Sequence, residues 1–215
     1  MKLDFRNNLT TSQKRTTQMV TNAFFLLLSK KNFDDITVRE ICRLSLIPHS
    51  TFYNYFEDKY DVFRWAFFHI IYGYYPEMDV KMNHYDNIED YSERVCDFID
   101  DYKSIISKIV IHNPMNGTFH QLVRQCMYEI GEIVADNCTR DKNFDFPYEV
   151  LFNNYINGFL EIFNQTFYYK KEYTRKQIKT YEDKILHIHL LVAIGQCRLC
   201  TRIHRQHRQR RYIVA

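Results

Sequence analysis

The sequence predicts an all-α protein, with an N-terminal three-helix head of the helix-turn-helix kind and a C-terminal helical body. The chain of 215 residues contains five Gly and four Pro, which is too few for a turn-rich all-β protein. Apolar residues recur at spacings of three and four along most of the chain, as they do in amphipathic helices. With 46% hydrophobic residues, the chain can bury the core of one or two domains.

Residues 37–59 predict two short helices around a tight turn. The first helix opens with a capping box, in which Thr37 precedes Glu40 by three residues. Its buried side has helical spacing and consists of Val38, Ile41 and Cys42. Residues 44–48 break the helix, and we expect Pro48 in the first turn of the second helix, where its missing N–H would be unpaired anyway.

The second helix of this pair is predicted to hold two aromatic anchors and to expose polar side chains. Phe52 and Phe56 are four residues apart and therefore lie on one face. The residues left on the other faces can hydrogen-bond to phosphates and to base edges in the DNA major groove: His49, Ser50, Thr51, Tyr53, Asn54 and Tyr55. An ordinary helical hairpin in a core is the alternative, and exposed tyrosines followed by Lys59 disfavour it.

These residues carry a resemblance to a known family. Residues 51–56, Thr-Phe-Tyr-Asn-Tyr-Phe, followed by Asp58 and Lys59, resemble the recognition-helix signature of the tetracycline-repressor (TetR) family of bacterial transcription regulators. The match covers about the first 70 residues, because residues 16–32 resemble the first helix of that family and residues 33–41 the segment that leads into its second. Leu46 stands where the family prefers Gly in a turn that often needs a positive φ, and Pro48 and Ser50 also depart from the pattern.

The resemblance implies roles for individual residues. Thr51, Tyr55 and Lys59 would bind phosphates, with Tyr53 close to the backbone of the DNA. Arg39 would lie near a base or a phosphate, and His49 and Ser50 would face base edges. The DNA-binding residues expected in all are Thr37, Arg39, Pro48, His49, Ser50, Thr51, Tyr53, Asn54, Tyr55 and Lys59.

Charge divides the chain into three parts that match the expected domains. We expect a DNA-binding head at residues 1–60, an effector-binding and dimerisation body at 61–197, and a basic, disordered tail at 198–215. Residues 1–65 hold ten Lys or Arg against seven Asp or Glu, and the tail holds six Arg and no acid. Residues 66–197 hold 13 basic against 19 acidic residues, a balance that keeps the body away from phosphates.

Helical spacing continues through the body. A stripe from Val62 to Ile70 is expected to link the head to the body, and further helices are expected over 95–109, 119–134 and after Pro147. Residues 178–192 carry apolar positions spaced 3, 4, 3 and 4, the seam of helices that pack along one another. This pattern predicts a homodimer with a four-helix interface, which the resemblance also implies, through Phe152, Ile156, Phe163, Ile178, Tyr181, Ile185, Ile188 and Val192.

The chain is rich in aromatic residues, with 17 Phe and 17 Tyr. An aromatic core encoded by an A/T-rich genome explains this composition as well as a binding cavity does. The resemblance implies a small-molecule effector between the middle helices, of a chemical class that no pattern identifies. The candidate lining residues are His69, Tyr72, Tyr102, Phe119, Tyr155 and Phe159.

Other classes of function find little support in the sequence. It has no Gly-rich phosphate loop, HExxH or Gly-x-Ser-x-Gly motif, so we expect no enzyme and no cofactor. Cys197, Cys200, His204 and His207 lie too close together for a zinc finger and among Arg residues, so we expect no metal. Without an apolar run of 18 residues or a leader peptide, we expect a cytoplasmic protein that has no disulfide framework.

The sequence therefore predicts a dimeric, sequence-specific DNA-binding transcription regulator, a repressor by the habit of the family that it resembles. It would bind a palindromic operator in double-stranded DNA and be released by the effector. The alternative is a helical ligand-binding or protein-interaction module whose head is only structural. Salt-dependent binding to duplex DNA distinguishes the two.

Overall fold

The computed structural model of the chain describes residues 9–82, 88–137, 148–182 and 184. These residues form helices and connecting turns, with no β-strand among them, so the predicted all-α class is confirmed. Residues 175–182 are also helical. The elements in chain order are α1 (Thr11–Leu28), the 3₁₀ helix η1 (Phe33–Asp35), α2 (Val38–Ser45), α3 (His49–Tyr55), α4 (Lys59–Tyr74), α5 (Ile88–His112), α6 (Thr118–Asn137) and α7 (Tyr148–Phe167).

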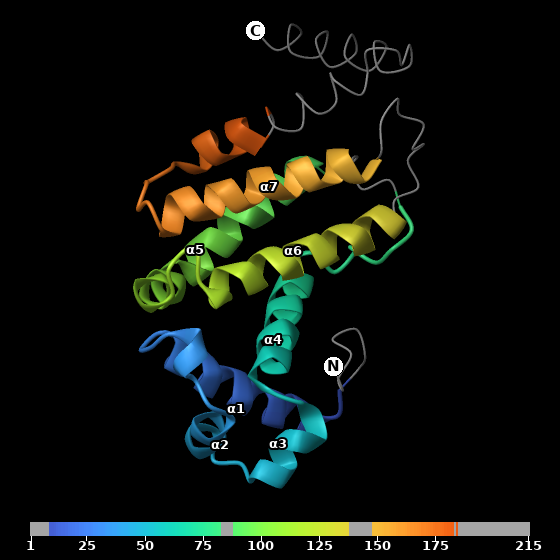
Figure 1. Cartoon of the computed structure of the whole chain (residues 1–215). Coiled ribbons are helices and arrows are strands. Elements are labelled where there is room, and N and C mark those ends of the chain that lie inside the picture. The colour runs from blue at the N-terminus through green and yellow to red at the C-terminus, as the bar shows by residue number, and fades with distance from the viewer. Residues whose placement is uncertain (1–8, 83–87, 138–147, 183, 185–215) are drawn as a thin grey trace, which may run out of the picture.

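The head consists of α1, η1, α2 and α3, and α4 rises from it into the body formed by α5, α6 and α7 (Figure 1). The first helix begins at a capping box, because the Thr10 hydroxyl accepts from the Gln13 N–H and the Gln13 side chain accepts from the Thr10 N–H. Its buried face has helical spacing and includes Val20, Ala23, Phe24 and Leu27. This stripe is the floor on which α2 and α4 pack.

The second helix starts and ends as its sequence requires. The Thr37 hydroxyl accepts from the Glu40 N–H at 3.3 Å, and the Glu40 carboxylate accepts from the Thr37 N–H at 3.1 Å, which confirms the predicted capping box. The helix ends at Leu46, which has a φ of 56° and a ψ of 34°. The N–H groups of Leu46 and Ile47 both donate to the Cys42 carbonyl, and this termination requires a left-handed residue at position 46.

One expectation about this turn is wrong in detail. Pro48 is the residue that precedes α3, with a φ of −62° and a ψ of 150°, and it is not part of the first helical turn. The extended backbone at this position is what a helix N-cap requires, and the fixed φ of Pro is compatible with it. Pro48 has no side chain that can cap, so α3 begins without a side-chain hydrogen bond at its N-cap.

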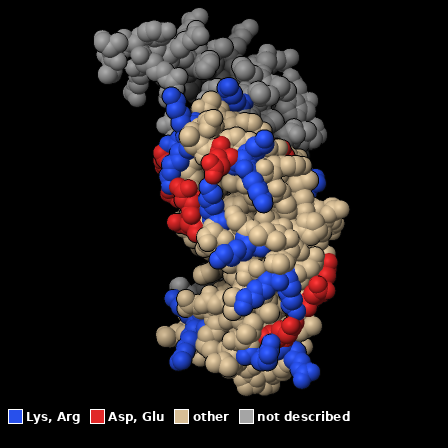
Figure 2. Space-filling model, turned by 90° about the vertical axis from the view of Figure 1, so that its left-hand side faces the viewer, with Lys and Arg blue, Asp and Glu red and all other residues tan. Residues whose placement is uncertain are grey.

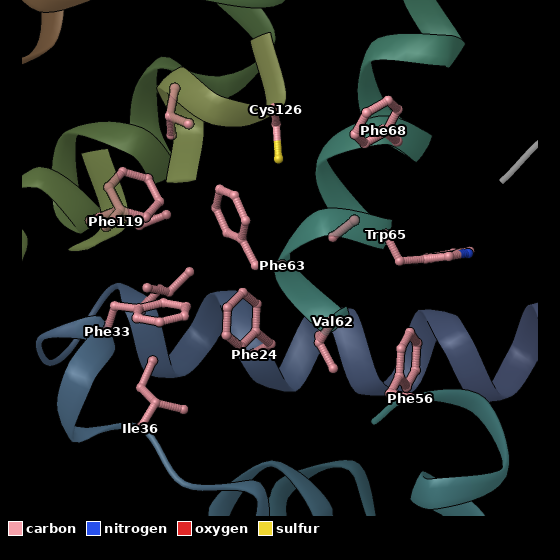
Figure 3. Close-up of a cluster of buried hydrophobic side chains, with 14 of the residues drawn as sticks. Phe24, Phe33, Ile36, Phe56, Val62, Phe63, Trp65, Phe68, Phe119 and Cys126 are labelled. Atoms are coloured by element: carbon pink, nitrogen blue, oxygen red, sulfur yellow. The ribbon is translucent and has the colours of Figure 1, made fainter. Parts of the chain in front are cut away.

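The fourth helix joins the head and the body through a shared core. Val62, Phe63 and Ala66 are buried, and Phe63 lies between Phe24 of α1 and Phe119 of α6 (Figure 3). The ring centroids of Phe63 and Phe119 are 5.8 Å apart, with the rings edge to face. The expected domain boundary after residue 60 lies inside α4, and the apolar core is continuous across it.

A second apolar cluster holds the outer part of the body together. It contains side chains from α5, α7 and the helix at 175–182: Val95, Cys96, Ile99, Ile106, Ile162, Phe163, Phe167 and Ile178. At the rim of this cluster Arg175 pairs with Asp97 at 2.8 Å and with Asp100 at 2.5 Å. These ion pairs are exposed to water, so the apolar contacts provide most of the stability.

The described helices are too short or too polar to cross a membrane. Within the same residues, no cluster of His, Cys, Asp and Glu side chains is arranged to hold a metal ion. Cys42, Cys96 and Cys126 are buried and free, as expected for small apolar side chains in a helical core. Cys197, Cys200, His204 and His207 lie outside the described residues.

Candidate nucleic-acid interface

The helix α3 presents a polar face to solvent at the end of the head that is far from the body (Figure 1). His49, Ser50, Tyr53 and Asn54 are exposed, and Thr51 is half-buried. The rings of His49 and Tyr53 are 6.3 Å apart, so one turn of the helix places an imidazole and a phenol next to each other. These groups donate and accept hydrogen bonds at the length needed to reach into the major groove.

Two phenylalanines hold α3 against the rest of the head. Phe52 and Phe56 have no exposed surface, and their ring centroids are 5.6 Å apart. Phe56 also lies edge to face with Trp65 of α4 at 6.1 Å, near the base of α4 in Figure 3. The predicted anchoring role of both residues is confirmed, because they fix which face of α3 is turned outward. Tyr55 contributes to this anchoring, because its half-buried ring packs against the same core.

Thr37 and Arg39, at the start of α2, are both exposed. The Thr37 hydroxyl is used as a helix cap, as described above. Lys31 donates to the Glu40 carboxylate at 2.7 Å and to the Asp35 carbonyl at 2.7 Å. The bond from Lys31 and the Thr37 hydroxyl lower the pKa of Glu40 to about 2, so this carboxylate is ionised at neutral pH and keeps the cap formed. Arg39 is exposed to solvent at the start of α2.

Lys59 was expected to bind phosphate. In the structure its ammonium bonds to η1 within the head. Its Nζ donates to the carbonyls of Phe33 at 2.9 Å and Asp34 at 2.8 Å, and lies 4.8 Å from the centre of the Phe33 ring. Burial of the ammonium lowers the pKa of Lys59. Two of its three N–H groups are engaged with η1, which leaves one for a ligand.

Basic side chains are exposed on the surface of the head. Figure 2 shows Lys and Arg around its lower end, with acidic side chains among them. Lys14 and Arg15 on α1 and Arg39 and Arg43 on α2 are all exposed. The head therefore carries scattered exposed cations and no dense basic patch on the face shown, and such cations can contact a phosphate backbone.

The turn between α5 and α6 holds η1 from the side of the body. Asn113 has 1% exposure, and its Oδ1 accepts from the Phe33 N–H at 2.7 Å. Its Nδ2 donates to the Ile109 carbonyl at 2.9 Å, and Asn32 donates to the His112 carbonyl at 3.1 Å. The Thr118 hydroxyl donates to the Asp34 carboxylate at 2.9 Å. The body and Lys59 thus contact the same three-residue helix, η1, which links the body to the start of α4.

The residues expected to line an effector cavity are divided among four helices. Phe119 is buried in the main core against Phe63, and Phe159 is half-buried between the two clusters. His69 stacks on Trp65 at 4.8 Å, and Tyr102 stacks on Phe98 at 5.2 Å. Tyr72 is half-buried, and the Tyr155 side chain lies outside the described residues. Packing accounts for Phe119, His69 and Tyr102, and cavity lining stays a prediction.

The residues expected at a dimer interface also lie in different places. Ile156, Phe163 and Ile178 have exposures of 3, 7 and 5%, because they form part of the core of a single protomer. Tyr181 is exposed at 44%. The side chain of Phe152 lies outside the described residues, as do Ile185, Ile188 and Val192. Of the described positions, Tyr181 is therefore the one available to a partner, and the interface stays a prediction.

Sequence reasoning missed two residues that position the site. Nothing in the sequence around Asn113 indicates a contact with Phe33, 80 residues earlier. Trp65 was not singled out, although it contacts both Phe56 of the head and His69. The spacing of Phe56 and Trp65 across a helix start gives no periodic signal, so neither contact was accessible to pattern analysis.

Comparison with known proteins gives a likeness of fold. No model of a known protein family matches the sequence, and no curated protein matches it. A structure described as a TetR-family transcriptional regulator from Syntrophomonas wolfei str. Goettingen has a TM-score of 0.54 at 18% identity, covering 86% of this chain and 98% of that one. The dihydroxyacetone kinase operon activator DhaS has a TM-score of 0.50 at 14% identity, covering 83% of this chain and 96% of that one. The chain therefore has the fold of a TetR-family transcriptional regulator, over nearly the whole length of both relatives.

Proposed function

We propose that this chain is a sequence-specific transcription regulator that binds double-stranded DNA. The observation that carries this function is the division of α3, with Phe52 and Phe56 fully buried and His49, Ser50, Tyr53 and Asn54 exposed. A helix of seven residues that is anchored by buried aromatic side chains on one face is expected in a scaffold that presents its outer face. Of the two structures of similar fold, one is described as a transcriptional regulator and the other as an operon activator, which supports the same class.

The chain acts as a homodimer on a palindromic operator. One copy of α3 contacts few base pairs, and two copies on adjacent half-sites multiply the affinity. The direction of regulation is a separate matter. DhaS is named as an activator, so the fold accommodates activation as well as the repression that the sequence resemblance implies. A small-molecule effector binds in the body and releases the DNA, and ligand screening would identify its chemical class.

Selection of bound duplexes from a random pool tests this function directly. The expected result is an inverted repeat whose half-site spacing reflects the separation of two α3 helices. Affinity for the selected duplex should then fall steeply with salt, because neutralised phosphates release counterions. A pool that yields no enriched sequence, together with no salt-dependent binding, would leave the head as a structural element only and sink the proposal.

A further inference from the structure

Leu46 combines two features that are unusual in one residue. It adopts a left-handed backbone, with a φ of 56°, and the residue is 84% exposed. The backbone conformation is imposed by the bonds from Leu46 and Ile47 to the Cys42 carbonyl, and Gly would adopt it at no steric cost. Ile47, the next residue, packs against the core of the head, so the apolar requirement of the turn is met without Leu46.

The position of Leu46 in the head determines what its side chain can contact. It lies in the turn between α2 and α3, followed by exposed Pro48 and His49. In helix-turn-helix proteins the first residues of the second helix face base edges, while the helix before it crosses the phosphate backbone. A side chain in the turn between them therefore reaches the rim of the major groove. The apolar group displayed in that groove is the C5-methyl of thymine.

We propose that Leu46 is a specificity-determining residue that contacts the methyl group of one thymine in each half-site. This inference rests on the proposed DNA-binding function. The contact removes apolar surface of both Leu46 and the base from water, which compensates in the complex for exposure and backbone strain in the free protein. Phosphate and deoxyribose are the same at every nucleotide, so a contact to them would not distinguish one sequence from another.

The test uses the full chain and the operator recovered by selection. Each thymine of a half-site is replaced in turn by deoxyuridine, which lacks only the C5-methyl group. We expect the natural protein to lose affinity about fourfold at one of these positions, since that is the usual worth of one buried methyl group. Leu46→Ala should bind the thymine operator about fourfold more weakly and should show no further loss with deoxyuridine at that position.

Three further variants separate the side chain from the backbone. Leu46→Gly should behave like Leu46→Ala on DNA while melting at a higher temperature, because Gly relieves the left-handed strain. Leu46→Met should keep the methyl discrimination. Lys170 is the matched control, since it has a φ of 53° and lies in the body. Lys170→Gly should melt at a higher temperature and leave the thymine profile unchanged.

Each other outcome overturns the inference. If Leu46→Ala and Leu46→Gly keep the affinity and the deoxyuridine sensitivity of the natural protein, the methyl group is recognised by another residue or by none. A selected operator without thymine in its half-sites would also overturn it, while leaving the proposed function intact. Failure to select any duplex is the separate result that removes the DNA-binding function itself, and this inference with it.

Discussion

The Oδ1 atom of Asn113 accepts a hydrogen bond of 2.7 Å from the backbone N–H of Phe33, across 80 residues of sequence. This bond joins the α5–α6 turn of the body to η1 of the head. Phe33 is itself fully buried, with its ring edge to face against Phe24 at 6.1 Å and Phe63 at 6.2 Å. This polar contact, placed inside an aromatic cluster, therefore contributes to the orientation of the head on the body.

Replacing Asn113 by Leu should destabilise the protein by about 3 kcal/mol, because the volume is kept while the buried N–H of Phe33 loses its acceptor. Urea unfolding followed by circular dichroism measures this loss. Asn116→Leu, at an exposed position of the same turn, serves as the control and should change the free energy of unfolding by less than about 0.5 kcal/mol. Equal effects of the two substitutions would mean that the bond to Phe33 contributes nothing specific.

Replacing Lys59 by Met should affect both stability and DNA binding. Loss of the bonds to the Phe33 and Asp34 carbonyls should lower the free energy of unfolding by about 1–3 kcal/mol. If the third N–H binds a phosphate, the slope of log affinity against log salt should also fall by about one. Lys30→Met removes an exposed charge at the end of α1 and controls for the change in net charge. A variant as stable as the natural protein would contradict the role of Lys59 in holding η1.

Replacing His49 by Ala should affect DNA sequence preference and not stability, in contrast to the Lys59 substitution, if His49 contacts bases. The change should alter base preference at one or two operator positions, worth about 1–3 kcal/mol each, and leave the stability of the protein unaffected. Competition binding with single-base variants of the selected operator measures the preference. Uniform weakening on all duplexes would assign His49 to the phosphate backbone instead.

Glu182 should make stability depend on pH. Its side chain is 3% exposed, and burial raises the pKa from 4.5 to about 7, with Ser92 opposing the shift. The folded state therefore holds a proton that the unfolded state has released, so stability falls as the pH rises from about 4.5 and the loss is complete above about 7. The full loss is about 3 kcal/mol. Glu182→Gln should remove it, raising the melting temperature at pH 8 but not at pH 4. A variant with the pH dependence of the natural protein would contradict this assignment.

The sequence predicted those features of the head that depend on neighbours a few residues apart. The capping box of Thr37 and Glu40 and the burial of Phe52 and Phe56 follow from spacings of three and four. The bonds of Asn113 to η1 could not be predicted in this way, because they join distant segments. The apolar spacing around Ile178 was also ambiguous, since a periodic stripe shows that one face is covered but not whether the cover is the same chain or a second copy.

Substitutions at Ile178 and Tyr181 test separately whether a face of this helix is covered by the same chain or by a second copy. Ile178 lies in the protomer core with Val95 and Phe163, whereas Tyr181, one helical turn later, is exposed. Ile178→Asp should place an unpaired carboxylate in that core and destabilise the chain by about 3 kcal/mol or more. Tyr181→Asp should leave the helix content and the melting temperature of the protomer nearly unchanged, but it should yield monomers in analytical ultracentrifugation. The monomer should bind the selected operator more weakly, because it engages one half-site at a time. A Tyr181→Asp variant that remains dimeric would place the interface away from this residue, whereas monomers that retain their fold would mark Tyr181 as part of the surface that a second copy covers.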